Sequence, residues 1–426
     1  MLVSNRESEF SKVLNTGDVL VVAFGAMIGW GWVVSSGQWI TSGGVLGTVL
    51  GFIIGGIMIY FVGLCYAELT TAMPKCGGEH VFSYKAFGSI GAYICTWSII
   101  LSYIGVVCYE AVSFPTILQY VFPKIARGYL YSVGGFDIYF TWLLIAIGMA
   151  LLILFLNIIG MKKAARFQKI LTCVIAAVGI ALVAGAAYSG NVNNLQNQLL
   201  VGDTNGEIIQ NIAKVAIMTP FFLFGFDVIP QAAEEINVPL KKLGKMMILS
   251  IIMAVSFYVL VVLAVGYVMN AEQIKTSMLS ATGLVTADAM GVAFNNANMA
   301  KVLIIGGLCG IVTSWNSFLI GGSRALYSMS VSYMLPRKFA VLHKKYNTPV
   351  NSLLLIGALS VISPFFGRSM LVWIVDAGNF ACCFAYCIVS LSFIVLRRKE
   401  ADMRRPYKVK HYKFVGIVAV IMSGTM

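Results

Sequence analysis

An apolar segment near residues 18–40 is interrupted by the glycine-rich stretch Gly25-Ala26-Met27-Ile28-Gly29-Trp30-Gly31. About 200 residues later, an apolar segment near 211–232 is interrupted by Phe224-Gly225-Phe226-Asp227. Inside a lipid bilayer, unwound backbone is tolerated only where it is buried in protein or lines a cavity, because its N–H and C=O groups otherwise have no partner. Two broken helices in corresponding positions of two halves are typical of the binding site of a secondary transporter. The pair therefore predicts a membrane protein whose substrate site lies between the two breaks.

The composition of the chain is that of a membrane protein. Of its 426 residues, 59% are hydrophobic and only 11% are charged, whereas soluble proteins average about 25% charged residues. Ten apolar segments approach the roughly 20 residues that a membrane-spanning helix needs. These segments lie near 18–40, 44–66, 90–121, 138–158, 168–189, 211–232, 246–269, 300–328, 351–365 and 370–396. An eleventh begins near 413 and reaches Met426 before it is long enough to span, so we expect a truncated eleventh span, in a chain that is either truncated or ends at an unusual terminus.

The basic residues behind the net charge of +13 are concentrated in alternate loops of this arrangement. With the N-terminus placed inside, the inner loops carry basic clusters at 162–169, 241–245, 337–345 and 397–413. Such a bias marks the cytoplasmic side of a polytopic membrane protein. We therefore expect an integral membrane protein with a cytoplasmic N-terminus, and the short loops and tails favour a bacterial plasma membrane. The charge is explained by topology, so we expect the lipid bilayer, and no nucleic acid, as a partner.

Five spans precede the long loop near 190–210, and five follow it. Because five is odd, the two halves enter the membrane from opposite sides, and each half begins with its broken span. This predicts an all-α polytopic protein built on an inverted five-plus-five repeat with helices 1 and 6 broken. The transporter core is expected at 1–396, with spans 1–5 at about 18–189 and spans 6–10 at about 211–396. A basic cytoplasmic loop and the partial eleventh span occupy 397–426.

The first break suits a carboxylate ligand. Its glycines release the backbone from helical torsions at little steric cost, and the resumed helix presents free N–H groups and the positive end of its dipole. The alternative is that the glycines only allow close helix packing. The residues predicted to bind the substrate here are Ala26, Met27, Ile28, Gly29, Trp30 and Gly31.

The second break suits a substrate ammonium group. Pro220 and Pro230 bracket it and remove helical hydrogen bonds, so the first half-helix ends in free carbonyl groups. An anion site facing a cation site fits a free α-amino acid. The aromatic side chains here are expected to close the pocket, although each of them could instead pack against lipid or a neighbouring helix. The predicted substrate-binding residues of this break are Phe222, Phe224, Gly225, Phe226 and Asp227.

Four motifs resemble, in order, those of the amino acid–polyamine–organocation (APC) superfamily. The stretch 25–31 matches its Gly-x-x-Ile-Gly-x-Gly motif, although Trp30 stands where a small residue is common. The others are similar to the loop after span two, to the sixth-span signature of amino acid permeases, and to the cytoplasmic end of span eight; they are Pro74-Lys75-Cys76-Gly77-Gly78, 224–235 and 323–336. The resemblance covers essentially the whole chain. It implies a permease that moves amino acids by alternating access.

Acidic residues inside spans are costly and so are functional candidates. Glu110 lies within span three, where the resemblance links an acid to the transport core. Asp227 follows the second break and is expected to hold its backbone, whereas Asp376 is expected to start span ten, near the outer gate or as a helix cap. For Glu234 and Glu235, a helix cap or a salt bridge to Lys241 or Arg324 is favoured over substrate contact.

The resemblance also bears on the coupling ion. Many proton-coupled or ion-independent relatives place a lysine in span five, where this chain has Ile175. Without that cation, the carbonyl groups of Gly25 and Ile28, with the hydroxyl pair Thr313-Ser314 of span eight, resemble the ligands of a sodium site, and oxygen ligands suit a hard cation. We expect sodium-coupled symport. Proton coupling and exchange are the alternatives. The two hydroxyls could also bond only to the backbone of their own helix.

Other classes of function have little support in the sequence. A channel would be expected to repeat a filter motif, and none is visible. A membrane-embedded enzyme would need a cluster of catalytic side chains, whereas the three histidines stand at unrelated positions. We therefore expect no enzymatic activity, no metal and no cofactor besides a coupling Na⁺ or H⁺. The amino acid carried and the oligomeric state cannot be read from the sequence.

Overall fold

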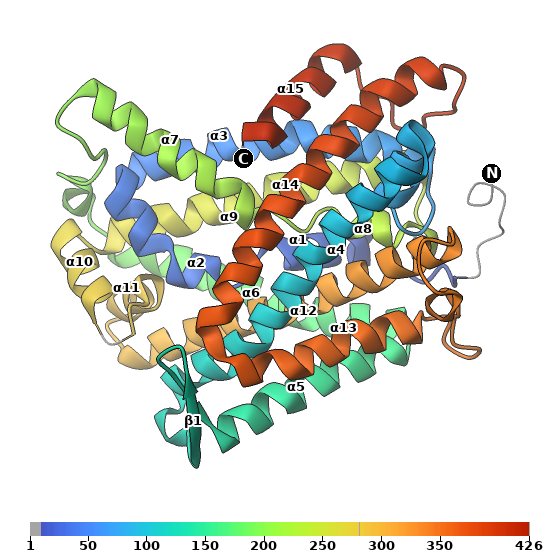
Figure 1. Ribbon diagram of the computed structural model, residues 1–426. Helices are drawn as coiled ribbons and strands as arrows, with labels where there is room; N and C mark the ends of the chain where they lie inside the picture. The colour runs from blue at the N-terminus through green and yellow to red at the C-terminus, as the bar shows by residue number, and fades with distance from the viewer. Residues whose placement is uncertain (1–9, 281, 426) are drawn as a thin grey trace.

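The computed structural model describes residues 10–280 and 282–425 and is dominated by helices, most of which run side by side (Figure 1). The helices of the first half are α1 (Thr16–Met27), α2 (Gly31–Val34), α3 (Ser36–Ala72), α4 (Glu79–Val121), α5 (Phe140–Ile158) and α6 (Met161–Ser189). Those of the second half are α7 (Asn205–Phe222), α8 (Val228–Gln231), α9 (Leu240–Val268), α10 (Ala271–Leu279), α11 (Val285–Ala293), α12 (Ala297–Val331), α13 (Val350–Ile362), α14 (Gly367–Lys399) and α15 (Tyr412–Thr425). A small antiparallel hairpin, β1 (Tyr129–Val133) and β2 (Phe136–Tyr139), precedes α5.

The structure confirms a polytopic all-helical membrane protein. Within the described part of the chain, seven helices are long and apolar enough to cross a bilayer: α3, α4, α5, α6, α9, α12 and the portion 373–399 of α14. Three of the ten predicted spans are absent from this set: the first and the sixth are divided, into α1 and α2 and into α7 and α8, and the ninth corresponds to the shorter helix α13. Both predicted breaks are therefore present. The inverted repeat that the topology suggested stays a prediction.

Two helices extend beyond their predicted limits across a kink. The third span was expected from about residue 90, but α4 already begins at Glu79 and bends at Gly88, whose φ of +77° is left-handed. In the same way α3 begins at Ser36 and bends at Gly44, with a φ of +78°. Glycine adopts such torsions without a Cβ penalty, so the apolar pattern continues while the direction of the helix changes.

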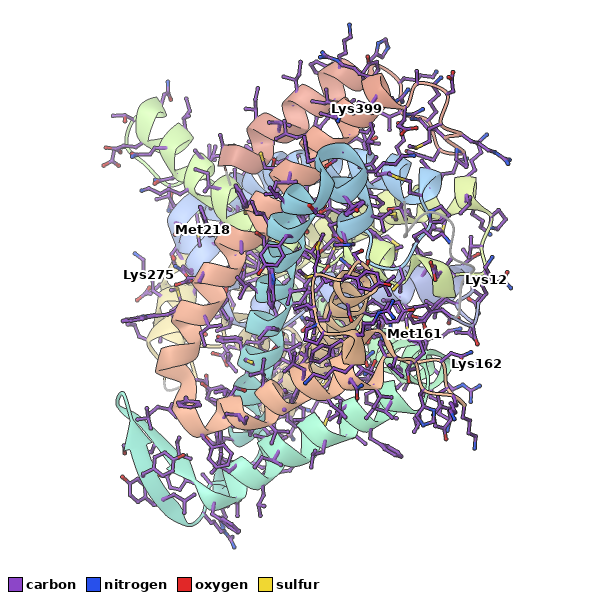
Figure 2. The ribbon with its side chains drawn as sticks, turned by 45° about the vertical axis from the view of Figure 1, so that its right-hand side comes forward. Lys12, Met161, Lys162, Met218, Lys275 and Lys399 are labelled. Carbon is purple, nitrogen blue, oxygen red and sulfur yellow. The ribbon has the colours of Figure 1, made fainter. Side chains whose placement is uncertain are left out.

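Three lysines labelled in Figure 2 lie at the ends of the helices that the alternating loops predict for them. In Figure 2, Lys12 and Lys162 lie at one end of the helices, and Lys275 lies at the opposite end. The predicted inner and outer sides therefore correspond to opposite ends of the bundle. The cytoplasmic location of the first end stays a prediction.

Helix α12 is the central support of the bundle. In its most apolar stretch 89% of the residues are buried, compared with 56% or less in the other six candidate spans. It packs against α4, α6, α1 and α13. Small residues allow this close contact, because a Cβ on Gly310 would stand only 2.5 Å from the carbonyl oxygen of Gly29. Helix α12 therefore fixes the position of the first break.

A buried ion pair ties α12 to the chain after α8. Arg324 Nε donates to Glu235 Oε1 at 2.8 Å, and both side chains are almost completely buried. This confirms the salt bridge to Arg324 that the sequence favoured. Glu234 differs, since its Oε1 lies 3.9 Å from Lys75 Nζ in a more exposed position.

We predict that Glu235→Gln destabilises the protein much more than Glu234→Gln. Removing one partner of a buried ion pair leaves an uncompensated charge and costs about 3–5 kcal/mol, whereas the Glu234–Lys75 pair is longer and more exposed, so its loss costs less. Thermal unfolding of the purified variants in detergent measures the difference. Equal melting temperatures for the two variants would show that the Arg324 pair does not stabilise this end of the bundle.

Candidate substrate site

The first break separates α1 from α2 by three residues. Ile28 ends α1, where its N–H donates to Phe24 O at 3.0 Å, and its ψ of +79° leaves the helical region. The first hydrogen bond of the next helix is donated by Val33 to Trp30 O at 2.9 Å. The N–H groups of Trp30 and Gly31 precede that bond, so they have no acceptor within α2. The break therefore offers the free donors that the sequence predicted.

The second break is pressed directly against the first. Gly225 has a φ of +127°, a conformation that favours glycine, and a Cβ placed on it would stand 2.6 Å from the Cβ of Ala26. The same position is 3.0 Å from the backbone nitrogen of Met27. Two segments about 200 residues apart in the sequence are thus in backbone contact, as a shared site requires.

Asp227 holds the unwound backbone of the second break. Its Oδ1 accepts from the N–H of Gly225 at 2.9 Å and from the hydroxyl of Tyr386 at 2.9 Å, and its Oδ2 accepts from the hydroxyl of Tyr103 at 2.5 Å. The side chain is completely buried. These bonds give the carboxylate the partners that a buried charge requires. Asp227 therefore has the backbone-holding position expected from the sequence.

A cavity of about 280 Å³ lies beside the two breaks, lined by residues of both breaks and of α4, α9, α12 and α14. Nine predicted residues belong to its lining: Ala26, Met27, Gly29, Trp30, Gly31, Glu110, Phe222, Phe224 and Ser314. Six others lie outside the lining: Gly25, Ile28, Gly225, Phe226, Asp227 and Thr313. The structure thus places predicted residues from both breaks around one cavity.

Several lining residues were not predicted from the sequence. Tyr258 of α9 donates its hydroxyl to the carbonyl oxygen of Met27 at 3.0 Å, so it supplies a partner for the end of α1. Phe221 also lines the cavity, next to the predicted Phe222. The one available signal for Tyr258 is a hydroxyl inside an otherwise apolar span, because such groups usually have a partner when buried.

Asp376 lies in this cavity and not at the beginning of its helix. It is well inside α14, and with Val375 and Asn379 it forms the part of α14 that lines the cavity. The cap role considered from the sequence is therefore wrong. The expectation failed because the helix begins at Gly367, more than two turns before Asp376.

Glu110 stands beside the first break. Its side chain is 6% exposed and lines the cavity. Ser314 Oγ donates to Glu110 Oε1 at 2.5 Å, whereas Oε2 has no hydrogen-bond partner among the described residues. Glu110 Oε1 is also 3.5 Å from the position that a Cβ would occupy on Gly29. An acidic group thus lies next to the free N–H groups of the break.

The candidate ion ligands are close together, with polar side chains among them. A Cβ on Gly25 would stand 3.2 Å from Thr313 Cβ and 2.6 Å from Gln168 Nε2. Gln168 Nε2 donates to Thr313 O at 3.0 Å, and Thr313 Oγ1 donates to Gly310 O of its own helix at 2.9 Å. The hydroxyl of Ser314 likewise donates to Ile311 O of its own helix at 3.0 Å, so both hydroxyls of the pair bond their own helix backbone. Binding of an ion by these residues stays a prediction.

Known permeases and transporters match this chain over nearly its whole length. The sequence model of a family described as amino acid permease matches residues 14–426. The methylthioribose transporter of Bacillus subtilis is 24% identical over 99% of this chain and 88% of its own length, and the branched-chain amino acid permease of the same bacterium is 26% identical over 94% and 84%. The histidine permease of Lactococcus lactis is 23% identical over 99% and 88%.

We predict that Gly310→Ala is strongly destabilising. The new methyl group would meet Gly29 O at 2.5 Å and Ile28 O at 2.9 Å, and backbone atoms cannot rotate away as a side chain can. Overpacking of this kind costs about 1–3 kcal/mol. The matched control is Gly148→Ala in α5, where a Cβ would meet no atom within 4 Å. Thermal unfolding in detergent compares the two, and equal stability would show that α12 does not fix the first break.

Proposed function

Because this chain belongs to the amino acid permease family, we propose that it is a secondary active transporter of free α-amino acids. The observation that carries the proposal is the contact of two broken helices at the wall of one cavity, with Gly225 against Ala26. Discontinuous helices of this kind bind the substrates of secondary transporters at the middle of the membrane. The substrate and the mechanism are our proposal.

The two breaks would bind the two ends of an amino acid. The free N–H groups of Trp30 and Gly31, with Gly29 beside them, suit the α-carboxylate. The carbonyl groups at the end of α7, near Phe222, suit the α-ammonium. Trp30 lines the cavity where the APC motif commonly has a small residue, so its indole ring would narrow the carboxylate end. Backbone groups would thus recognise the part that all α-amino acids share.

Transport would proceed by alternating access. The unwound segments 28–30 and 223–227 join α1 to α2 and α7 to α8, and such segments can absorb a change of direction without breaking a long helix. Phe222 and Phe224 line the cavity, and their rings would separate a bound substrate from water on one side. Net uptake and exchange would use the same movement.

Purified protein in liposomes tests the function directly. We predict that uptake of labelled amino acids is saturable and is accelerated by unlabelled substrate inside the vesicles. The acceleration is expected because the binding site of a carrier reorients to the outside faster with substrate bound than without it. Each radiolabelled amino acid of a full panel is offered to protein-containing and to empty liposomes. A flux that does not saturate would indicate a channel, and no flux with any amino acid would contradict the proposed function.

We propose sodium as one candidate coupling ion. The carbonyl groups of Gly25 and Ile28 and the hydroxyl groups of Thr313 and Ser314 would be its ligands, since hard cations prefer oxygen. The proposal is supported by the short distance between the first break and α12, where a Cβ on Gly310 would stand 2.9 Å from Ile28 O.

A second candidate, the proton, is favoured by the position of Glu110. A substrate carboxylate on the first break would lie close to the Glu110 carboxyl group, whose Oε1 is 3.5 Å from the Cβ position of Gly29. Two like charges in a buried site disfavour each other. A proton on Glu110 would remove this repulsion, so substrate and proton would bind together.

Ion replacement combined with one substitution separates the two candidates. If sodium couples, replacing external sodium with choline abolishes accumulation, and Thr313→Ala weakens it. If the proton couples, accumulation persists in choline and follows an inward pH gradient. Glu110→Gln, which mimics the protonated form, then retains exchange and loses the response to the gradient. Accumulation that responds to neither ion would leave exchange as the mode of transport.

A further inference from the structure

The cavity beside the two breaks has an acidic lining. Its described lining contains two carboxyl groups, those of Glu110 on α4 and Asp376 on α14, and contains no lysine, arginine or histidine. Glu110 is 6% exposed, and its Oε2 has no hydrogen-bond partner among the described residues. An unpartnered, buried acceptor in the wall of a cavity is costly unless a ligand satisfies it. The site is therefore built for a ligand that brings positive charge.

Asp376 is positioned to contact the part of a ligand that extends toward α14. Its helix passes close to α4, because a Cβ on Gly378 would stand 3.2 Å from Ser102 Cα and one on Gly105 would stand 3.2 Å from Ile374 O. Figure 1 shows α14 and α4 crossing the bundle side by side. Asp376 is exposed and forms no ion pair with any described residue. Its carboxylate thus remains available to a ligand in the cavity.

We propose that Asp376 selects substrates with a positively charged side chain, so that the site takes basic amino acids. This inference rests on the proposed function, in which the α-carboxylate binds at the first break and the α-ammonium at the end of α7. With the shared part bound there, the side chain of the substrate extends toward α14, where Asp376 and Asn379 supply polar groups.

The charges of the site agree with this assignment. The coupling cation, whether on Glu110 or on the oxygen atoms beside Gly25, offsets one negative charge near the first break. Asp376 then remains as the charge that the substrate itself must match. A basic side chain matches it, a neutral side chain leaves it unpaired, and an acidic side chain is repelled.

Competition for uptake into liposomes tests the inference. Unlabelled L-lysine, L-arginine, L-leucine and L-glutamate compete with the labelled amino acid that the panel identifies as transported. We expect lysine and arginine to compete at about tenfold lower concentration than leucine, and glutamate not to compete. In Asp376→Asn, we expect the competing concentration of lysine to rise about tenfold and that of leucine to change less than about twofold. Asp376→Glu keeps the charge and restores the preference.

The matched control is Asp203→Asn, since Asp203 is an exposed acid before α7 that does not line the cavity. It is expected to leave the competition of all four amino acids unchanged. Leucine competing better than lysine in the unmodified protein would overturn the inference. If Asp376→Asn weakens the competition by lysine and by leucine equally, the inference is also overturned, because Asp376 would then bind the common α-ammonium group. Absence of uptake for every amino acid is a different outcome and contradicts the proposed function itself.

Discussion

The requirement that every backbone polar group in a membrane finds a partner determines the architecture of this protein. Unwinding a helix at residues 28–30 and again at 223–227 exposes N–H and C=O groups that lipid cannot satisfy. The two unwound segments are therefore placed against each other and enclosed by other helices. Asp227 accepts from the N–H of Gly225, and Tyr258 donates to Met27 O. The donors that remain next to the cavity are those that a ligand can use.

Close packing follows from the same requirement. Helix α12 can enclose the first break only because Gly310 and Gly307 lack side chains: a Cβ would stand 2.5 Å from Gly29 O in one case and 2.3 Å from the Trp30 ring in the other. The indole of Trp30, which stands where the APC motif commonly has a small residue, is thus packed against α12 and lines the cavity. Small residues on one helix make room for the bulky residue on its neighbour.

Much of the fold could be predicted because its signals are local. Apolar length reveals the spans, and glycine and proline within such a length reveal the breaks. The lining of the cavity could be predicted only in part, since unwound backbone has no helical period from which to infer the direction of a side chain. Phe221 and Phe224 line the cavity, whereas Phe226 is buried beside Tyr66 and Tyr386. Contacts between distant helices, such as Ser314 with Glu110, leave no pattern in either segment.

The site divides recognition between backbone and side chains. In the proposed function, the backbone donors beside Gly29 bind the α-carboxylate, which is a group that all α-amino acids share. Side chains complete the lining of the cavity, and α14 contributes three of them. Of these, Val375 and Asn379 are uncharged and Asp376 is acidic. In the proposal above, Asp376 is the charge that the side chain of the substrate must match, because an unmatched charge disfavours binding more than a lost apolar contact does. Under that proposal, α14 determines selectivity while the broken helices bind the part that all α-amino acids share.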